Sequence, residues 1–190
     1  GRLLDCGYPM KIIASNIPEV LIFEPAVYND DRGYFMETWR QSVFDERGLD
    51  TAFVQDNHSK SNRGTLRGLH YQLSHPQGKL ARVISGEVFD VAVDLRKSST
   101  HFGRWTGVVL SAENKKQVWV PPGFAHGFYV ISESAELLYK CTEYYDSEDE
   151  HCLLWNDKTV GVDWPLLDSS PFLSDKDKNA QQLSEAAVYP

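Results

Sequence analysis

A series of short β-forming segments, separated by turn residues, runs through most of this chain and restricts the folds that it can adopt. The clearest segments are residues 20–23, 33–39, 80–84, 88–95, 105–110, 117–120, 127–131 and 136–142. Turn residues interrupt them at roughly the 8–12-residue spacing that is typical of β-sandwiches and barrels. A jelly-roll barrel leaves few free strand edges and can enclose a ligand, so we predict this architecture.

Helical signals are few. Residues 42–47, followed by Gly48, fit one short capped helix, and the tail between residues 173 and 187 has room for one or two more. We therefore expect one all-β domain over residues 10–190, with a few short peripheral helices. Residues 1–9 differ in character from the rest of the chain, and Met10 looks like a natural start, so we interpret them as a remnant of cloning and exclude them from the fold.

Length and charge narrow the classes of function. The chain has 190 residues, enough for one domain with a sizeable core, and its formal net charge of −8 argues against a nucleic-acid partner. An acidic chain can still bind an anionic ligand where its basic side chains converge. No apolar run is long enough to span a membrane and no secretory signal is visible, which predicts a cytoplasmic protein without a membrane partner. Three cysteines without metal-ligand spacing (Cys6, Cys141 and Cys152) favour reduced cytosolic thiols.

Two glycine-containing motifs each place a histidine in a strand-like segment: LRGLHYQ at residues 66–72, with His70, and PPGFAH at residues 121–126, with His126. The second motif has the Pro-x-Gly-x-x-His form of cupin barrels, in which the histidine points into the barrel. Metal-binding cupins add another histidine and a glutamate, but Gln72 and Lys79 stand at those positions here. A lysine cation opposes metal binding, so we predict a cupin-like barrel without a metal site.

Two histidines in such a barrel suggest acid–base chemistry. A neutral imidazole is a good base near pH 7, and a neighbouring carboxylate orients it. Removing a proton next to a carbonyl also requires a cation close to the oxygen that becomes an enolate, a role open to Lys79 or Arg67. Tyr139, on a predicted strand, could return a proton to the opposite face. Any of these residues alone would more often be structural, and it is their combination that favours catalysis.

Six motifs, in order and spacing, resemble the dTDP-4-dehydrorhamnose 3,5-epimerase family. They are DRGYFME (31–37), FVQDNHS (53–59), LRGLHYQ (66–72), QGKL (77–80), GEVFDVAVD (86–94) and PGFAHGF (122–128), and the resemblance runs from about Met10 to about Asp177. It implies conversion of dTDP-4-keto-6-deoxyglucose to dTDP-4-keto-rhamnose by inversion of the two carbons that flank the ketone. It also implies that neither a metal nor a redox cofactor takes part.

The resemblance assigns catalytic roles to four residues. His70 matches the base, Tyr139 the proton donor, Lys79 the cation near the keto oxygen, and Asp177 the carboxylate that pairs with the base. Asp90 is the competing partner, because neighbouring strands could place it against either histidine.

Contacts to the dTDP-sugar follow from the same resemblance: Arg32, Glu37, Gln55, Asp56, Asn57, Arg67, His126, Glu150 and Lys176. Tyr145, or alternatively Tyr144, matches an aromatic ring that stacks on thymine, and the carboxylates at 148–150 compete for the place of Glu150. Family members act as homodimers that exchange strands near the N-terminus. Arg32 and Glu37 would then complete the site of the other subunit.

Three other functions remain open. The chain could invert C3 alone, or act on a related sugar nucleotide, since such enzymes share the base motif. It could bind sugar nucleotides without catalysis, or it could be a metal-dependent cupin that uses His70 and His126. The product that the resemblance implies is rhamnose for a surface polysaccharide such as lipopolysaccharide.

Overall fold

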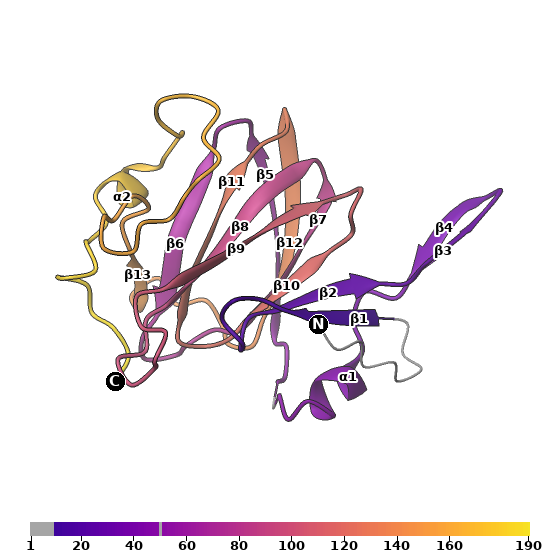
Figure 1. Cartoon of the computed structure of the whole chain (residues 1–190), viewed down its shortest axis with the longest axis horizontal. Coiled ribbons are helices and arrows are strands. Elements are labelled where there is room, and N and C mark those ends of the chain that lie inside the picture. The colour runs from indigo at the N-terminus through magenta and orange to yellow at the C-terminus, as the bar shows by residue number, and fades with distance from the viewer. Residues whose placement is uncertain (1–9, 50) are drawn as a thin grey trace.

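The computed structural model describes residues 10–49 and 51–190, and it folds them mainly into two antiparallel β-sheets (Figure 1). The six-stranded sheet has the order β1 (Met10–Ala14), β2 (Leu21–Pro25), β10 (Gln117–Val120), β7 (Lys79–Ser85), β12 (Ser134–Cys141) and β5 (Gln55–Asn62). The five-stranded sheet has the order β13 (Glu150–Cys152), β6 (Leu66–Gln72), β11 (Phe124–Val130), β8 (Glu87–Asp94) and β9 (Trp105–Ser111). The proposed cloning remnant, which includes Cys6, lies outside the described residues.

Three smaller elements complete the fold. Strands β3 (Val27–Asp30) and β4 (Gly33–Met36) form a separate hairpin that extends away from the barrel (Figure 1). Helices α1 (Gln41–Asp45) and α2 (Asp175–Lys178) are short and peripheral. The prediction of an all-β fold with a few short peripheral helices is therefore confirmed. No helix within 10–49 or 51–190 is both long and apolar enough to cross a membrane.

The main core lies between the two sheets and follows from the two-residue period of the strands. On β12, Ala135, Leu137 and Cys141 are buried and alternate with more exposed residues, and Tyr139 continues their row. These side chains meet apolar residues of the other sheet, including Val88, Ala92, Leu110, Phe128 and Val130. Tyr139 packs against this core, so the pattern of β12 alone turns its phenol toward the barrel interior.

The C-terminal segment covers the outer face of the five-stranded sheet. Leu69 and Tyr71 of β6 pack there in one cluster with Leu153, Val160 and Trp164. Backbone hydrogen bonds hold the segment in place, among them Leu66 N to Phe172 O at 3.0 Å. Burial of this apolar face draws the chain back across the sheet, and it leaves α2 beside β6 (Figure 1).

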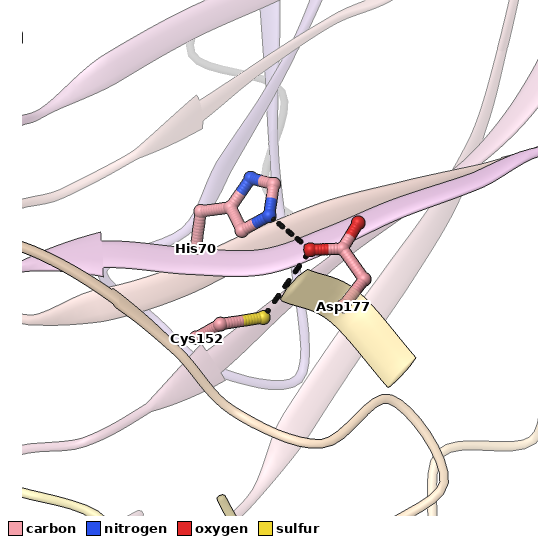
Figure 2. A group of neighbouring side chains, drawn as sticks. All are labelled: His70, Cys152 and Asp177. Carbon is pink, nitrogen blue, oxygen red and sulfur yellow. Dashed lines mark hydrogen bonds and ion pairs between the residues drawn. The ribbon is translucent and has the colours of Figure 1, made fainter. Parts of the chain in front are cut away.

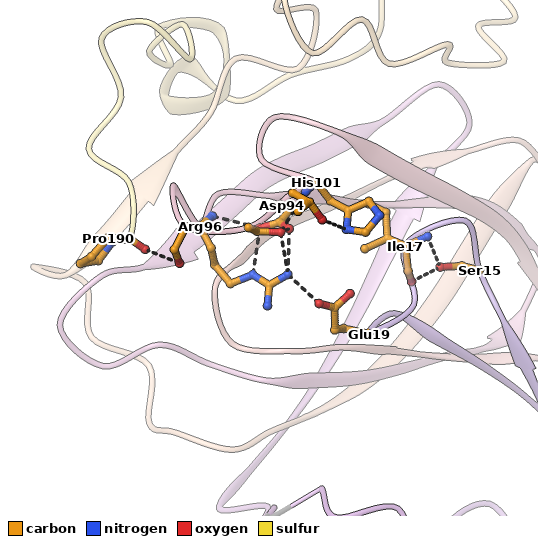
Figure 3. A network of polar contacts seen from close by, with 10 residues as sticks. Ser15, Ile17, Glu19, Asp94, Arg96, His101 and Pro190 are labelled. Atoms are coloured by element: carbon orange, nitrogen blue, oxygen red, sulfur yellow. Dashed lines mark hydrogen bonds and ion pairs between the residues drawn. The ribbon is translucent and has the colours of Figure 1, made fainter.

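A polar network at the end of β8 connects three segments that are distant in the sequence (Figure 3). Asp94 is fully buried, and its Oδ2 lies 2.8 Å from Arg96 Nη2. Arg96 also reaches Glu19 at 3.1 Å, while the Ser98 hydroxyl donates to the Pro190 carbonyl at 3.2 Å. This network fixes the end of the chain against the loop after β8.

Strands β6 and β11 approach closely at two glycines. A Cβ on Gly68 would lie 2.7 Å from Gly127 Cα and 2.7 Å from His126 O, and the φ of Gly68 is +117°. Only glycine fits this position without moving the backbone. The register shifts beside it, between His126 and Phe128, and His126 becomes the direct cross-strand neighbour of His70. The glycines of the two motifs thus bring the two histidines together.

Candidate active site

His70, on β6, is paired with a carboxylate from the far end of the chain. Its Nε2 lies 2.7 Å from Asp177 Oδ1, and the amide of Gly68 donates to Asp177 Oδ2 at 3.3 Å (Figure 2). Ser174 caps α2 by accepting a hydrogen bond from the Asp177 amide at 3.2 Å. Asp177 is thereby held at one turn of helix, and it, rather than Asp90, is the partner of His70.

The electrostatics of this pair determine which nitrogen of His70 is free. Burial raises the pKa of Asp177, but hydrogen bonds from His70, Gly68 and Cys152 outweigh it and hold the pKa below its usual value. The carboxylate is therefore ionised at neutral pH, and Nε2 must carry the proton that it donates. In the neutral imidazole this leaves the lone pair on Nδ1, which can accept a proton.

His126 is more completely enclosed. Its Nε2 lies 2.9 Å from each carboxylate oxygen of Asp90, and both residues are buried. The side chain of His126 is 6% exposed, against 25% for His70. Each histidine thus has its own carboxylate, and His70 is the one that solvent and ligands can reach.

Lys79 and Tyr139 come from the opposite sheet. Lys79 Nζ lies 5.9 Å from the centre of the Tyr139 ring, on the neighbouring strands β7 and β12. Burial lowers the pKa of Lys79, while nearby negative groups, among them Glu150 and Asp90, oppose that effect. Burial raises the pKa of Tyr139, so its phenol is protonated at neutral pH and can serve as an acid.

Glu150 connects several predicted ligand contacts at the rim of the site. Its Oε1 lies 4.0 Å from His70 Nδ1, and its Oε2 accepts from Lys176 at 2.7 Å and from the Tyr145 hydroxyl at 2.9 Å. Tyr145 also donates its amide to Gln55 Oε1 at 3.0 Å. Glu150 and Tyr145 therefore lie at the site. The rings of both tyrosines are exposed, but the backbone carbonyl of Tyr144 accepts from Gln72 Nε2 at 3.1 Å, whereas the hydroxyl of Tyr145 contacts Glu150.

Strand β5 adds a row of polar groups. Gln55 Nε2 donates to Asn57 Oδ1 at 3.1 Å, and Asn57 is the cross-strand neighbour of Tyr139. Further along the row, Arg67 of β6 donates to the Ser61 hydroxyl at 2.8 Å. Amide and guanidinium groups of this kind suit the pyrophosphate and sugar hydroxyls of a nucleotide sugar.

Three predicted contacts are not brought to His70 within this chain. Asp56 is paired with Lys140 at 3.1 Å and its side chain is 71% exposed, because alternation along β5 directs it away from Asn57. Arg32 lies in the hairpin, paired with Asp30 at 2.6 Å, and Glu37 is paired with Arg40 at 2.6 Å. The fold of one chain does not explain a role for these three residues in its own site.

A surface cavity lies beside part of this arrangement. Its lining residues are Thr38, Asp56, Asn57, Leu80, Arg82, Gln117, Leu138, Tyr139 and Lys140. The cavity touches Tyr139 but not His70. The hydrogen-bonded groups around His70, rather than this hollow, therefore define the candidate active site.

One residue at the site was missed by the sequence reasoning. Cys152 Sγ lies 3.5 Å from Asp177 Oδ1, the same oxygen that His70 contacts (Figure 2). Burial raises the pKa of this thiol and the charge of Asp177 raises it further, so the sulfur is protonated. No spacing rule points to Cys152, because its position follows from the pairing of β13 with β6, in which Cys152 lies opposite His70.

These groups define a class of protein: a β-barrel with a carboxylate-paired base, a buried lysine and a protonated phenol, suited to moving protons next to a carbonyl. A family model described as dTDP-4-dehydrorhamnose 3,5-epimerase matches residues 14–185. The chain belongs to this family of sugar-nucleotide epimerases, which confirms the resemblance read from the motifs.

Individual relatives support the same assignment. The chain is 56% identical over 182 residues to dTDP-4-dehydrorhamnose 3,5-epimerase of Shigella flexneri, covering 95% of this chain and 99% of that protein. The crystal structure of dTDP-6-deoxy-D-glucose-3,5-epimerase from Legionella pneumophila, in complex with dTDP-4-keto-L-rhamnose, has a TM-score of 0.91 at 50% identity, covering 94% and 95% of the two chains. ChmJ, a 3'-monoepimerase from Streptomyces bikiniensis in complex with dTDP-quinovose, has a TM-score of 0.83 at 34% identity, covering 90% and 87%. The cupin-like form of the barrel is confirmed by these neighbours.

Proposed function

We propose that this chain converts dTDP-4-dehydro-6-deoxy-D-glucose to dTDP-4-dehydro-L-rhamnose by inverting C3 and C5. The observation that carries the proposal is the His70–Asp177 pair, with a contact of 2.7 Å and an open Nδ1. It is supported by the identity of 56% to the Shigella flexneri enzyme over nearly the whole chain.

The ketone at C4 acidifies the hydrogens on both neighbouring carbons. His70 Nδ1 takes the proton from one carbon, and Asp177 stabilises the imidazolium that forms. The electron pair moves onto the keto oxygen, where the ammonium of Lys79 offsets the enolate charge. Tyr139 then donates its proton to the opposite face of the carbon, and solvent restores both groups before the second carbon reacts.

The nucleotide is held by the polar rim. In this proposal Tyr145 stacks on thymine, while Arg67 and Lys176 neutralise the diphosphate, with further contacts from Gln55, Asn57, His126 and Glu150. Lys176 Nζ already lies 2.7 Å from Glu150, so both belong to one charged rim beside His70. Lys176 thus supplies a positive charge beside His70 despite the net negative charge of the chain.

A homodimer is part of the proposal. The hairpin β3–β4 extends away from the barrel and exposes Tyr28, Tyr34 and Phe35 at 58%, 58% and 71% (Figure 1). Such an exposed aromatic group is typical of an interaction surface. We infer that a second copy covers the hairpin, which then carries Arg32, and Glu37 just beyond it, to the partner's site.

A cytoplasmic location fits the same proposal. Cys141 and Cys152 are both free thiols in the structure, as expected of a protein in a reducing compartment. Cell fractionation with detection of the chain by antibody would test this location.

The test of function is NMR of the substrate during turnover in deuterated water. We expect deuterium at both C3 and C5 and the L-rhamno product. Deuterium at C3 alone, with inversion only there, would instead support the monoepimerase alternative, which the likeness to ChmJ makes specific. Binding of dTDP without exchange at either carbon would favour the non-catalytic alternative.

A single substitution tests whether His70 is the base. His70→Ala should lose about 10²–10⁴-fold in turnover, because a positioned base contributes that much, while dTDP binding stays near wild type. His58→Ala is the matched control, since His58 lies on the solvent side of β5 and contacts Glu136 at 2.8 Å. Turnover of His70→Ala within a few-fold of the control would remove His70 from the mechanism.

A further inference from the structure

We propose that His70, Cys152 and Asp177 form a binding site for a thiophilic divalent cation such as Zn²⁺, and that the bound ion inhibits the enzyme. One ligand atom from each residue, a ring nitrogen, a sulfur and a carboxylate oxygen, lies within 4.8 Å of the other two. Figure 2 shows the Asp177 oxygen between the His70 ring and the Cys152 sulfur. These are the three donor types that zinc prefers in proteins.

The distances are close to those of a zinc site. With zinc–ligand bonds of about 2.0–2.3 Å in a tetrahedron, neighbouring ligand atoms lie about 3.4–3.6 Å apart. Cys152 Sγ and Asp177 Oδ1 already lie 3.5 Å apart. His70 Nε2 and Asp177 Oδ1 are 2.7 Å apart, so these two atoms must separate as the ion replaces their shared proton. Water can fill the fourth position.

The three ligands are held by elements that do not depend on the ion. Pairing of β13 with β6 keeps Cys152 opposite His70, and the Ser174 cap together with the Gly68 amide orients Asp177. His70 and Cys152 are half-buried rather than enclosed. The site is therefore preorganised and can still be reached from solvent.

The charges balance when the ion binds. A neutral imidazole, a thiolate and a carboxylate carry two negative charges in total, which offset Zn²⁺, and the thiol releases one proton to solvent. The neighbouring cation Lys176 is already paired with Glu150 at 2.7 Å. The site also differs from the usual metal position of cupins, because Lys79 stands at one ligand place and His126 is paired with Asp90.

Inhibition follows from the tautomer of His70, and this part rests on the proposed function. Zinc takes the lone pair of Nε2, so the ring proton moves to Nδ1, on the side where Glu150 Oε1 lies at 4.0 Å. A protonated Nδ1 cannot accept a proton from substrate. The ion should therefore lower kcat more than it weakens binding of the nucleotide.

Zinc binding is measured by competition with a chromophoric chelator on the metal-stripped protein. We expect one Zn²⁺ per chain and a Co²⁺ form with a thiolate-to-cobalt charge-transfer band. Cys152→Ala should remove the band and weaken Zn²⁺ binding about 100-fold or more, since even outer partners of metal ligands contribute 10–100-fold. Cys6→Ala and Cys141→Ala are the matched controls and should keep both properties. Absence of the band in the wild type, or unchanged affinity in Cys152→Ala, would overturn the site.

Turnover measured at buffered concentrations of free Zn²⁺ tests whether the bound ion inhibits the enzyme, separately from whether it binds. We expect wild type to lose kcat over the range in which Zn²⁺ binds, and Cys152→Ala to resist it. Binding with the cobalt band but without inhibition would overturn the inhibitory role, whereas turnover of His70→Ala tests the assignment of the base separately. Such binding would leave the metal site standing.

Discussion

At the scale of single residues, the two histidines differ in their carboxylate partners and in how exposed their side chains are. His126 directs Nε2 at both oxygens of Asp90 and is almost fully enclosed, whereas His70 binds Asp177 and remains partly accessible. A base must reach its substrate, and since each histidine has its own carboxylate, the greater exposure of His70 is what favours it as the base. The same partner oxygen also contacts Cys152, which is how a base without a metal can acquire an inhibitory cation site.

Tyr139→Phe tests the proposed acid. The variant keeps the ring that packs on the core but loses the hydroxyl, so the first C–H exchange should continue while the inverted product falls about 10²-fold or more. NMR in deuterated water measures both quantities in one sample. Tyr129→Phe is a comparison within the same barrel, since the Tyr129 hydroxyl accepts from the Leu167 amide at 3.1 Å. Full product formation by Tyr139→Phe would mean that another group returns the proton.

At the scale of elements, the approach of β6 to β11 determines the geometry of the site. Gly68 and Gly127 allow the two backbones to come together at the point where His70 and His126 become neighbours. Neither strand alone carries this information, because the contact is between their backbones.

Gly127→Ala should therefore disturb catalysis as well as stability. The new Cβ would lie 2.5 Å from Arg67 O, and overpacking of this kind costs about 1–3 kcal/mol. Gly107→Ala, in β9 of the same sheet, meets the Phe89 ring at 2.3 Å and should also lower stability. We expect urea unfolding to show a lower free energy of unfolding for both variants. Kinetic assays should show a fall in kcat only for Gly127→Ala. An equal kcat in the two variants would show that the close contact at Gly127 does not determine the geometry of the active site.

The loop after β6 should be stabilised by a buried carboxylate. Asp149 accepts the amides of Leu73 at 3.2 Å, Ser74 at 2.9 Å and His75 at 2.8 Å. Burial raises the pKa of Asp149, but these backbone hydrogen bonds outweigh it and lower the pKa overall. A lowered pKa in the folded state adds stability above the unfolded value of about 3.9, and this is lost as the pH falls through the folded value.

Asp149→Ala should accordingly cost about 1.5–3 kcal/mol at pH 7, the range for hydrogen bonds to a charged group. The difference from wild type should narrow below about pH 4, as the wild-type carboxyl is protonated. Urea unfolding at pH 7, 5 and 3 measures this difference in the free energy of unfolding. Glu148→Ala, at an exposed neighbouring residue, is the control. A difference that stays constant with pH would show that packing, not charge, is responsible.

At the scale of the whole molecule, the position of the hairpin β3–β4 is not explained by contacts within a single chain. It carries Arg32 with a side chain 90% exposed, although the family resemblance assigns this residue to the ligand. A partner subunit reconciles the two observations, because the hairpin extends away from its own barrel (Figure 1).

Mixed dimers test this directly. If Arg32 acts in the partner's site, dimers of His70→Ala with Arg32→Ala contain one intact site, so random mixing should restore about a quarter of the wild-type activity. Each variant alone should be far less active. Co-expression with two affinity tags, followed by turnover assays, measures the result. No gain on mixing, with the mixed dimer isolated, would place Arg32 in its own subunit's site.

The sequence by itself determined much of this protein. The two-residue alternation and the spacing of turns predicted the strands, since both depend on neighbours along the chain. The motifs around His70, Lys79 and Tyr139 predicted acid–base chemistry, because those side chains have few other reasons to share a barrel interior. The family was also recognisable from the motifs alone.

The tertiary structure decided which side chains contact one another at the site. His70 and Asp177 are 107 residues apart, and the sequence left Asp90 as a competing partner. Burial of an apolar face places the C-terminal segment over β6 and brings Asp177 to His70. Cys152 reached the same carboxylate through strand pairing, which no spacing in the sequence encodes. Short sequence motifs determine which catalytic side chains are present. Contacts between distant segments depend on how the whole chain buries its apolar surface, and that is where the base obtained its carboxylate.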